Sequence, residues 1–305
     1  MQNFTSLALI ILCSFVVFFE CSSNFTDNAL GGDADSDTDA DGDGDSDGDG
    51  DSDGDGDSDG ESCRLVDVII SVDGSSSMGE ERKAMRETIF PAFATRLATI
   101  GHGLDNFRIA TIDACPDPAS FHTRGNGGEC NFEGGNAWIE STSSRLNDEF
   151  ACVGDIYLGD VNCSGSNDDE QPASAAARSL EEPFVSGNNR GFLREDALLV
   201  IVAITDEDET PTGAEKTAAQ IYNRIIRAKG GEVKRTVFLG IGGSKSCKGV
   251  YGSADESELL KDITNLFSEH GRGVFWDLCV GKLEDGLEQA FQVIEQACEE
   301  IGPVL

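Results

Sequence analysis

Two long, nearly continuous apolar runs restrict the fold of this chain more than any other feature. Residues 65–72 read LVDVIISV and residues 197–206 read ALLVIVAITD. Runs of this kind are typical of strands that are buried on both faces, as in the parallel sheets of α/β proteins. Shorter runs at 107–113, 236–241 and 273–279 predict three further strands. The chain is therefore expected to build a sheet that other elements cover on both sides.

Amphipathic helices are predicted between these strands. The first covers the apolar positions Met78, Met85, Ile89, Phe93 and Leu97, and the others cover 171–182, 215–229, 256–267 and 282–301. Ser77 and Glu80 have the spacing of a capping box at the start of the first helix. Strand and helix alternation predicts one α/β domain over 62–305, with a doubly wound, mostly parallel sheet and helices on both faces.

The segment 115–167 fits this alternation least well, because it is rich in Gly, Asn and Ser and holds four cysteines. We expect a long loop region there, with one further strand near 137–141 or 155–159. Long loops in compact domains are often functional.

The N-terminus has the pattern of an export signal. Residues 4–19 form an apolar run, and a helix of that length would reach about 24 Å, short of the ~30 Å hydrocarbon core of a bilayer. Cys21 then stands where bacterial lipoproteins carry their lipid-attachment cysteine, although Glu20 replaces the usual small residue. Cleavage after Ser23 and an uncleaved anchor are the alternatives. We assign 1–23 to a signal peptide, with Cys21 as the candidate lipidation site.

Cysteine usage also favours an extracytoplasmic protein. The chain has ten Cys, of which Cys13 and Cys21 belong to the signal region. The other eight could form four disulfides, with 105 possible connectivities, in an oxidising compartment. A zinc site is disfavoured because the chain has no Cys-x-x-Cys pair and only three His. We expect an outer-membrane or cell-surface lipoprotein, or else a secreted or periplasmic protein.

Residues 24–61 are predicted to be an acidic, low-complexity linker. The hexapeptide DGDSDG is repeated three times from Asp43 to Gly60. Alternating carboxylates repel one another and bury no apolar surface, so such a segment is extended and does not fold. Asp-x-Asp-x-Asp-Gly also opens calcium-binding loops, but counting from Asp49 the twelfth position is Gly60 and Glu61 comes one residue late. Weak Ca²⁺ binding is all that this linker predicts.

The charge balance excludes several classes of partner. The formal net charge is −35, and residues 62–305 hold 40 of the 57 Asp and Glu and all 22 Lys and Arg, which leaves the domain at −18. A surface this acidic repels nucleic acids and anionic lipid headgroups. Cations and basic partners are favoured, and we expect membrane contact only through a lipid anchor.

The first strand leads directly into a cluster of oxygen-bearing side chains. Asp73, Ser75 and Ser77 follow one another at two-residue spacing at its carboxyl end, and Asp206 ends the strongest apolar run. Ligands of doubly wound sheets bind beyond the carboxyl ends of the strands. Hydroxyl and carboxylate oxygens suit Mg²⁺. The alternative is a serine-rich turn whose hydroxyls cap the following helix.

With these residues the chain resembles the von Willebrand factor A domain and its metal-ion-dependent adhesion site. The segments FLREDALLVIVAITDEDE, FRIATID and VFWDLC are similar to the extracytoplasmic members of this family, often lipoproteins, in bacteria such as the myxobacteria. The resemblance implies that Ser75 and Ser77 bind the metal directly, and that Asp73 and Asp206 act mostly through water.

The third metal ligand of the family is a Thr, and here this chain departs from the pattern. Residues 162–180 read NCSGSNDDEQPASAAARSL and contain no Thr, so Ser164 or Ser166 must substitute. Asp206 also begins a run of four acids that could favour Mn²⁺ or Ca²⁺ over Mg²⁺.

These features predict a binding protein rather than an enzyme. The serine loop after the first strand does not match Gly-x-Ser-x-Gly, because Ser75 lies between Gly74 and Ser76, and the phosphate-binding P-loop motif and a strand-borne Gly-x-Gly-x-x-Gly are absent. The resemblance implies adhesion or protein recognition, in which the metal keeps one position for a partner's Asp or Glu carboxylate. The alternative is a structural envelope protein on an acidic spacer, with a vestigial metal site. A hydrolase is the least favoured interpretation.

Overall fold

The structure is a computed structural model that describes residues 65–97, 106–155, 170–210 and 217–301. All of them belong to one unit of the chain, Gly56–Leu305. The signal peptide 1–23 and the linker 24–61 predicted from the sequence lie outside the described residues.

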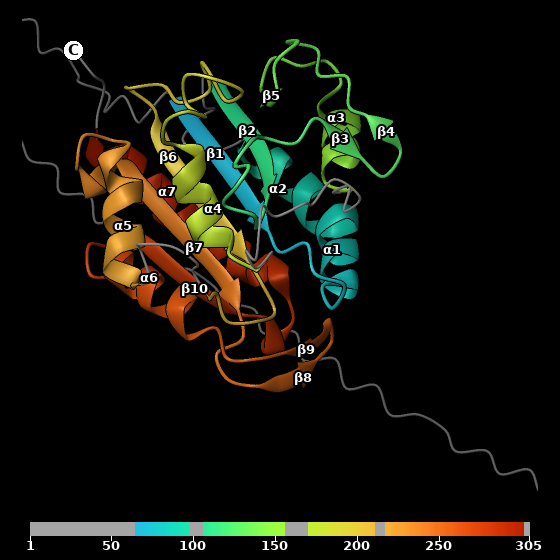
Figure 1. Cartoon of the computed structure of the whole chain (residues 1–305), viewed down its shortest axis with the longest axis vertical. Coiled ribbons are helices and arrows are strands. Elements are labelled where there is room, and N and C mark those ends of the chain that lie inside the picture. The colour runs from blue at the N-terminus through green and yellow to red at the C-terminus, as the bar shows by residue number, and fades with distance from the viewer. Residues whose placement is uncertain (1–64, 98–105, 156–169, 211–216, 302–305) are drawn as a thin grey trace, which may run out of the picture. The chain divides into compact units, whose positions relative to one another are not determined.

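A six-stranded sheet forms the centre of this unit (Figure 1). Its strands are β1 (Leu65–Val72), β2 (Asn106–Asp113), β5 (Ile139–Glu140), β6 (Leu198–Ile204), β7 (Thr236–Gly242) and β10 (Gly273–Asp277). Five of them pair in parallel, and β5 pairs with β2 antiparallel at one edge. The five strands predicted from apolar runs are therefore confirmed. The further strand falls within 137–141, one of the two positions considered.

The strand order places a topological switch point between β1 and β6. The order is β10-β7-β6-β1-β2-β5, so the chain builds outward from β1 on one side and then returns to build outward from β6 on the other. In doubly wound sheets the connections of the two halves diverge at this point, which leaves a crevice at the carboxyl ends of the strands. Both predicted metal-binding loops begin there.

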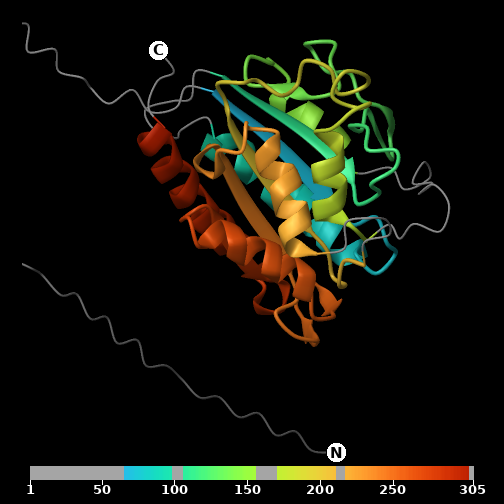
Figure 2. The same ribbon diagram turned by 60° about the vertical axis from the view of Figure 1, so that its left-hand side comes forward.

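Helices cover both faces of the sheet (Figures 1 and 2). One face carries α4 (Pro172–Ser179), α5 (Ala218–Arg227) and α6 (Glu258–Ser268), and the other carries α1 (Gly79–Ala84), α2 (Phe90–Leu97), α3 (Leu146–Val153) and α7 (Leu283–Ile301). Alternate residues of β1 point into two separate clusters of buried apolar side chains, Val68 and Ile70 into one and Ile69 into the other. This alternation is what a strand buried on both faces requires.

The helix predicted over 78–97 is interrupted. A π-helical turn, η1 (Met85–Ile89), separates α1 from α2, and the Phe90 amide donates to the carbonyl of Met85. Pro91 follows and has no amide hydrogen to donate, so the regular hydrogen-bond ladder cannot continue through it. The predicted capping box is wrong, because the N-cap residue is Met78 and no side chain caps the helix.

Other element ends differ from the sequence prediction by a few residues. The strand predicted over 273–279 ends at Asp277 and continues as a 3-10 turn, η5 (Leu278–Val280). Two short hairpins and one more 3-10 turn complete the described elements: β3 (Arg124–Gly125) with β4 (Gly128–Glu129), β8 (Cys247–Gly249) with β9 (Gly252–Ala254), and η4 (Val233–Arg235).

Disulfide bonds link loops of the described domain. Cys130 pairs with Cys152, and Cys247 pairs with Cys279. Cys115 and Cys298 are disulfide-bonded as well. Cys63 and Cys163 lie outside the described residues, so the expected total of four remains a prediction. Within the ranges described, no group of three or more His, Cys, Asp and Glu could hold a metal ion, and no helix is long and apolar enough to cross a bilayer.

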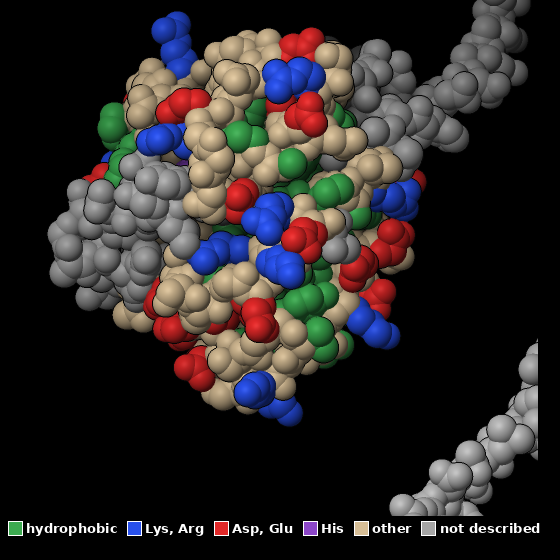
Figure 3. All heavy atoms as spheres, turned by 90° about the vertical axis from the view of Figure 1, so that its right-hand side faces the viewer, with side chains coloured by type: hydrophobic (Ala, Val, Ile, Leu, Met, Phe, Trp, Pro, Cys, Tyr) green, Lys and Arg blue, Asp and Glu red, His purple; other side chains and the backbone are tan. Residues whose placement is uncertain are grey.

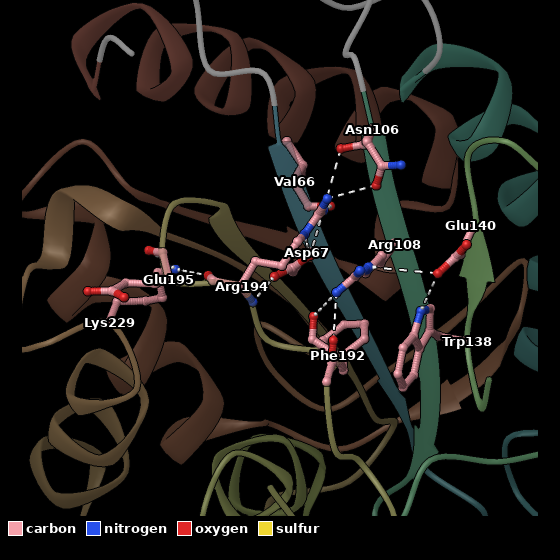
Figure 4. Close-up of polar contacts among 11 residues, drawn as sticks. Val66, Asp67, Asn106, Arg108, Trp138, Glu140, Phe192, Arg194, Glu195 and Lys229 are labelled. Carbon is pink, nitrogen blue, oxygen red and sulfur yellow. Dashed lines mark hydrogen bonds and ion pairs between the residues drawn. The ribbon is translucent and has the colours of Figure 1, made fainter. Parts of the chain in front are cut away.

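A buried ion pair ties the amino ends of the strands together (Figure 4). Asp67 of β1 is fully buried, and its carboxylate accepts from the Arg194 amide at 2.7 Å and from Arg194 Nε at 2.8 Å. Arg194 also donates to Asn106 Oδ1 at 2.7 Å and to the Val66 carbonyl at 3.0 Å. Burial raises the pKa of Asp67, and the Arg194 guanidinium opposes that shift. This explains how an acid is tolerated inside an apolar strand.

Removing the arginine should therefore destabilise the domain strongly. We expect Arg194→Ala to lower the free energy of unfolding by about 3–5 kcal/mol in urea denaturation at pH 7, because Asp67 is left buried without its partner. Arg145→Ala is the control, since Arg145 forms an exposed pair with Asp148 and should cost less than ~1 kcal/mol. Similar losses for the two variants would contradict this assignment.

Candidate metal centre

The pairing of β1 with β6 brings the two predicted metal-binding loops side by side. Val72 is in register with Ile204 at the ends of these strands, and the Asp73 amide donates to the Ile204 carbonyl at 2.9 Å. The loops therefore start from neighbouring strands at the switch point. Asp73 and Asp206 are both buried there.

Asp73 is held by hydrogen bonds to both of its carboxylate oxygens. The Ser75 amide donates to Oδ1 at 2.6 Å, and Thr205 Oγ1 donates to Oδ2 at 2.7 Å. Burial raises the pKa of Asp73 to about 6, although these hydrogen bonds favour the charged form. Asp73 thus fixes the shape of the serine loop and ties it to the end of β6. The sequence did not single out Thr205, the residue just before Asp206.

The two serine hydroxyls and the second aspartate converge on one point. Ser75 Oγ and Ser77 Oγ lie 2.8 Å apart, and Ser77 Oγ donates to Asp206 Oδ1 at 3.2 Å. Ser75 is half-buried and Ser77 is exposed, so this cluster opens to solvent on one side. The structure therefore brings together the four described residues that the sequence predicted for the site.

The two serine hydroxyls lie at a separation that would suit adjacent positions around Mg²⁺. In octahedral coordination at roughly 2.1 Å, adjacent ligand oxygens lie about 3.0 Å apart. The separation of the two serine hydroxyl oxygens, 2.8 Å, is close to that value, whereas the 3.2 Å between Ser77 Oγ and Asp206 Oδ1 is a hydrogen bond to a residue expected to act through water. Burial also raises the pKa of Asp206, and the nearby acids Glu207 and Asp255 raise it further. A divalent cation would offset this concentration of negative charge.

Arg82 supports the serine loop from the helix that follows it. Its Nη1 donates to the carbonyl oxygens of Gly74 and Ser75, at 3.1 Å each. These contacts fix the backbone on the side of the loop away from the hydroxyls. The sequence prediction missed this residue, because its role depends on how α1 leaves the loop.

Glu81, also on α1, is a buried acid with one unsatisfied oxygen. Its Oε2 has no hydrogen-bond partner. Burial raises the pKa of Glu81 to about 7, and the charge of Asp206 adds to the shift. The carboxyl group of Glu81 is therefore a third acid with a raised pKa close to the cluster, after Asp73 and Asp206.

The four acids of 206–209 serve separate purposes rather than one common site. Asp206 joins the serine cluster, whereas Asp208 Oδ1 accepts from the Leu259 amide at the start of α6. Glu209 is buried and accepts from the amides of Ala173 and Ser174, at 3.0 Å and 2.8 Å. Two of the acids thus occupy the positive N-terminal ends of helices.

Three of the predicted site residues lie outside the described residues. They are Ser164 and Ser166, the candidate replacements for the third metal ligand, and Cys21, the candidate lipidation site. Gln171 and α4 follow the serine-bearing segment directly, and the Gln171 amide donates to the Ala114 carbonyl just beyond β2 at 3.0 Å. The described chain therefore re-enters the fold at the same edge of the sheet as the cluster.

Comparison with known proteins finds only distant structural similarity. No protein-family profile and no curated protein sequence matches the chain. Proximal thread matrix protein 1 from the mussel byssus is similar at 14% identity and a TM-score of 0.41, over 78% of this chain and 49% of that chain. The pilus adhesin SpaC from Lactobacillus rhamnosus GG, in an open conformation, is similar at 12% identity and a TM-score of 0.38, over 78% and 30%. The chain spans less than half the length of these two proteins.

The buried position of Glu209 predicts a pH dependence of stability. Burial raises its pKa to about 7 from an ordinary 4.5, so the folded state binds this proton more tightly than the unfolded state. The resulting stabilisation is complete below the unfolded pKa and is lost as the pH rises through about 7. In metal-free buffer, Glu209→Gln should lose less stability than the wild type between pH 4.5 and 7.5, by up to ~3 kcal/mol.

Urea denaturation at a series of pH values measures this difference. Glu207→Gln is the matched control, because Glu207 belongs to the same acidic run but is half-buried. The free energy of unfolding of this control should change with pH as that of the wild type does. Parallel profiles for Glu209→Gln and the wild type would show that Glu209 is ionised throughout this range.

Proposed function

We propose that this protein is a von Willebrand factor A-like recognition module, which binds an Asp or Glu side chain of a protein partner through a metal ion. The observation that carries the proposal is the convergence of Ser75, Ser77 and Asp206 at the switch point of the sheet, at separations of 2.8 and 3.2 Å. Mg²⁺ is the proposed ion, with Mn²⁺ and Ca²⁺ as alternatives.

Each proposed ligand has a distinct part. Ser75 and Ser77 would bind the ion directly, with Ser164 or Ser166 as the third protein ligand. Asp73 and Asp206 would act mostly through water, since Asp73 has both oxygens engaged by Ser75 and Thr205. The exposed side of Ser77 leaves a coordination position for the partner's carboxylate.

The hydrogen bonds of the cluster favour binding over catalysis. The usual base of a serine nucleophile is a histidine within hydrogen-bond reach of its hydroxyl. Among the residues described, the hydroxyls of Ser75 and Ser77 bond to each other and to Asp206, whereas His122 Nε2 lies 2.9 Å from Asp113 Oδ2. The proposal therefore includes no bond-breaking step.

We further propose that the module works outside the cytoplasm. Disulfides such as Cys130–Cys152 and Cys247–Cys279 are typical of oxidising compartments. In this proposal the segment 1–23 directs export, Cys21 carries a lipid anchor in the outer membrane or at the cell surface, and the acidic linker 24–61 spaces the domain from its anchor. The linker would also bind Ca²⁺ weakly.

Calorimetric titration of the full chain with Mg²⁺, after removal of metal by a chelator, tests the metal site. Ser77→Ala should weaken the binding of one ion by about tenfold or more, because it removes a direct ligand. Asp255→Asn is the matched control, since Asp255 is exposed and its charge reaches Asp206 without belonging to the cluster. Every variant retains the linker, so any weak linker binding is common to all of them.

Equal Mg²⁺ affinity in the wild type and Ser77→Ala would overturn the proposed site. The protein would then be a structural envelope protein on an acidic spacer, with a vestigial site. If the site is real, comparing Ser164→Ala with Ser166→Ala identifies the third ligand, because only one of them should weaken Mg²⁺ binding.

A further inference from the structure

Two valines are exposed on the surface, unlike the other large apolar side chains of the described residues. Among the described residues, only Val250 and Val280 are large hydrophobic side chains that are strongly exposed, at 76% and 59%. Val250 lies in the turn of the β8–β9 hairpin, and Val280 ends the 3-10 turn η5. Exposed apolar side chains that gather at one place on an otherwise polar surface mark contact sites for a partner.

The two valines are held next to each other. The disulfide Cys247–Cys279 joins the start of β8 to η5, and the Val280 position follows directly on Cys279. A Cβ built on Gly281, the residue after Val280, would lie 3.4 Å from Val250 Cγ2. The two exposed valines therefore lie on neighbouring segments whose backbones are joined by a covalent bond, and we treat them as one patch.

Three lysines surround this patch on a domain that is otherwise acidic. Lys248 is on β8, Lys282 follows Gly281, and the carbonyl oxygen of Lys245 lies 3.6 Å from Cys279 Sγ. All three side chains are exposed, and none forms an ion pair with another described residue. Figure 3 shows basic side chains at the lower margin of the molecule, the level at which β8 and β9 lie in Figure 1. We refer to Val250, Val280 and these three lysines as the hairpin patch.

The backbone of Lys282 is also unusual. Its φ is +54°, and it is the one non-glycine residue with positive φ among those described. This conformation is uncommon for a side chain of this kind and persists only where the surroundings impose it. It keeps Lys282 exposed at the start of α7, beside Val280.

The hairpin that carries the patch is attached to the candidate metal centre. The Asp255 amide, just after β9, donates to the Asp206 carbonyl at 2.7 Å. Gly252 has a φ of +112°, and a Cβ added to it would lie 3.1 Å from Glu81 Oε1, so the hairpin packs closely against α1. A segment bound at the metal would therefore pass beside the hairpin.

We infer that the hairpin patch binds the part of the partner that flanks its metal-bound acid. The inference rests on the proposed function and narrows the partner to a peptide segment of stated chemistry. One Asp or Glu reaches the metal, a nearby aliphatic or aromatic residue covers Val250 and Val280, and further acids face the three lysines. Because the rest of the domain is strongly acidic, this basic patch would also orient an acidic segment that the remaining surface repels.

Selection from a displayed library of random twelve-residue peptides tests the inference on the purified full chain. Such peptides span roughly 40 Å when extended, which is enough to cross both sites. Selections run in parallel with Mg²⁺ and with a chelator. In Mg²⁺ the enriched peptides should carry an Asp or Glu, with an apolar residue and a second acid at a recurrent spacing from it.

Variants then separate the two sites. An enriched peptide should bind Val250→Ser/Val280→Ser about tenfold more weakly, because its apolar residue no longer covers apolar surface. Lys248→Glu should weaken binding by a similar factor, whereas Lys234→Glu should change it less than twofold. Lys234 is the matched control because it is an exposed lysine on η4. The Mg²⁺ affinity and melting temperature of all these variants should equal those of the wild type.

The outcomes distinguish this inference from the proposed function. Mg²⁺-dependent peptides that share an acid but no apolar or second acidic residue would overturn the role of the hairpin patch and leave the metal site intact. Enriched peptides with unchanged affinity for the valine variant would do the same. A selection that is indifferent to Mg²⁺ and to Asp73→Ala would overturn the metal-dependent function itself.

Discussion

The parallel pairing of β1 with β6 is the interaction on which the rest of the structure depends. These strands leave the core side by side, and each ends in an aspartate that the next loop uses. Because β1 and β6 belong to the two halves of the sheet, their loops diverge and the carboxyl edge stays open between them. The hydroxyls of Ser75 and Ser77 reach this edge only because Asp73 is fixed to Thr205 at the end of β6. A shift of one residue in the register of this pair would turn the Asp73 side chain away from Thr205, and the serine hydroxyls would no longer converge with Asp206.

Buried acids are a second organising feature of this domain, and each one is satisfied differently. Asp67 is neutralised by Arg194 at the amino ends of the strands, and Glu209 is placed at the N-terminus of α4. At the carboxyl edge, Asp73, Glu81 and Asp206 lie near one another, and burial raises the pKa of each, as it does for Asp67 and Glu209. Acids with a structural role are matched with a cation or a helix end. Those at the open edge share a single guanidinium, that of Arg82, whose charge acts on all three. A divalent cation would offset the negative charge that remains.

The β8–β9 hairpin, held by the Cys247–Cys279 disulfide, distinguishes this edge from a bare metal site. A bare metal site offers one coordination position and discriminates little among carboxylates. An adjacent apolar and basic surface adds the differential contacts on which specificity depends. The Cys247–Cys279 disulfide ties the hairpin to η5, and Cys247, Tyr251 and Cys279 pack against the core. The metal would then provide a common anchor, and the hairpin would choose among the partners that carry an acid.

The sequence by itself determined the layered α/β architecture and four members of the candidate site. Apolar runs such as LVDVIISV specify buried strands because their hydrophobic period is a local property, and Asp73, Ser75, Ser77 and Asp206 stand directly after such runs. Only the tertiary structure decided which groups satisfy the buried acids, how the cysteines pair, and that Val250 lies beside Gly281, the residue after Val280. These contacts join residues far apart in the chain, as Thr205 and Asp73 or Arg194 and Asp67 do. Their geometry follows from strand order and packing, which no local pattern encodes.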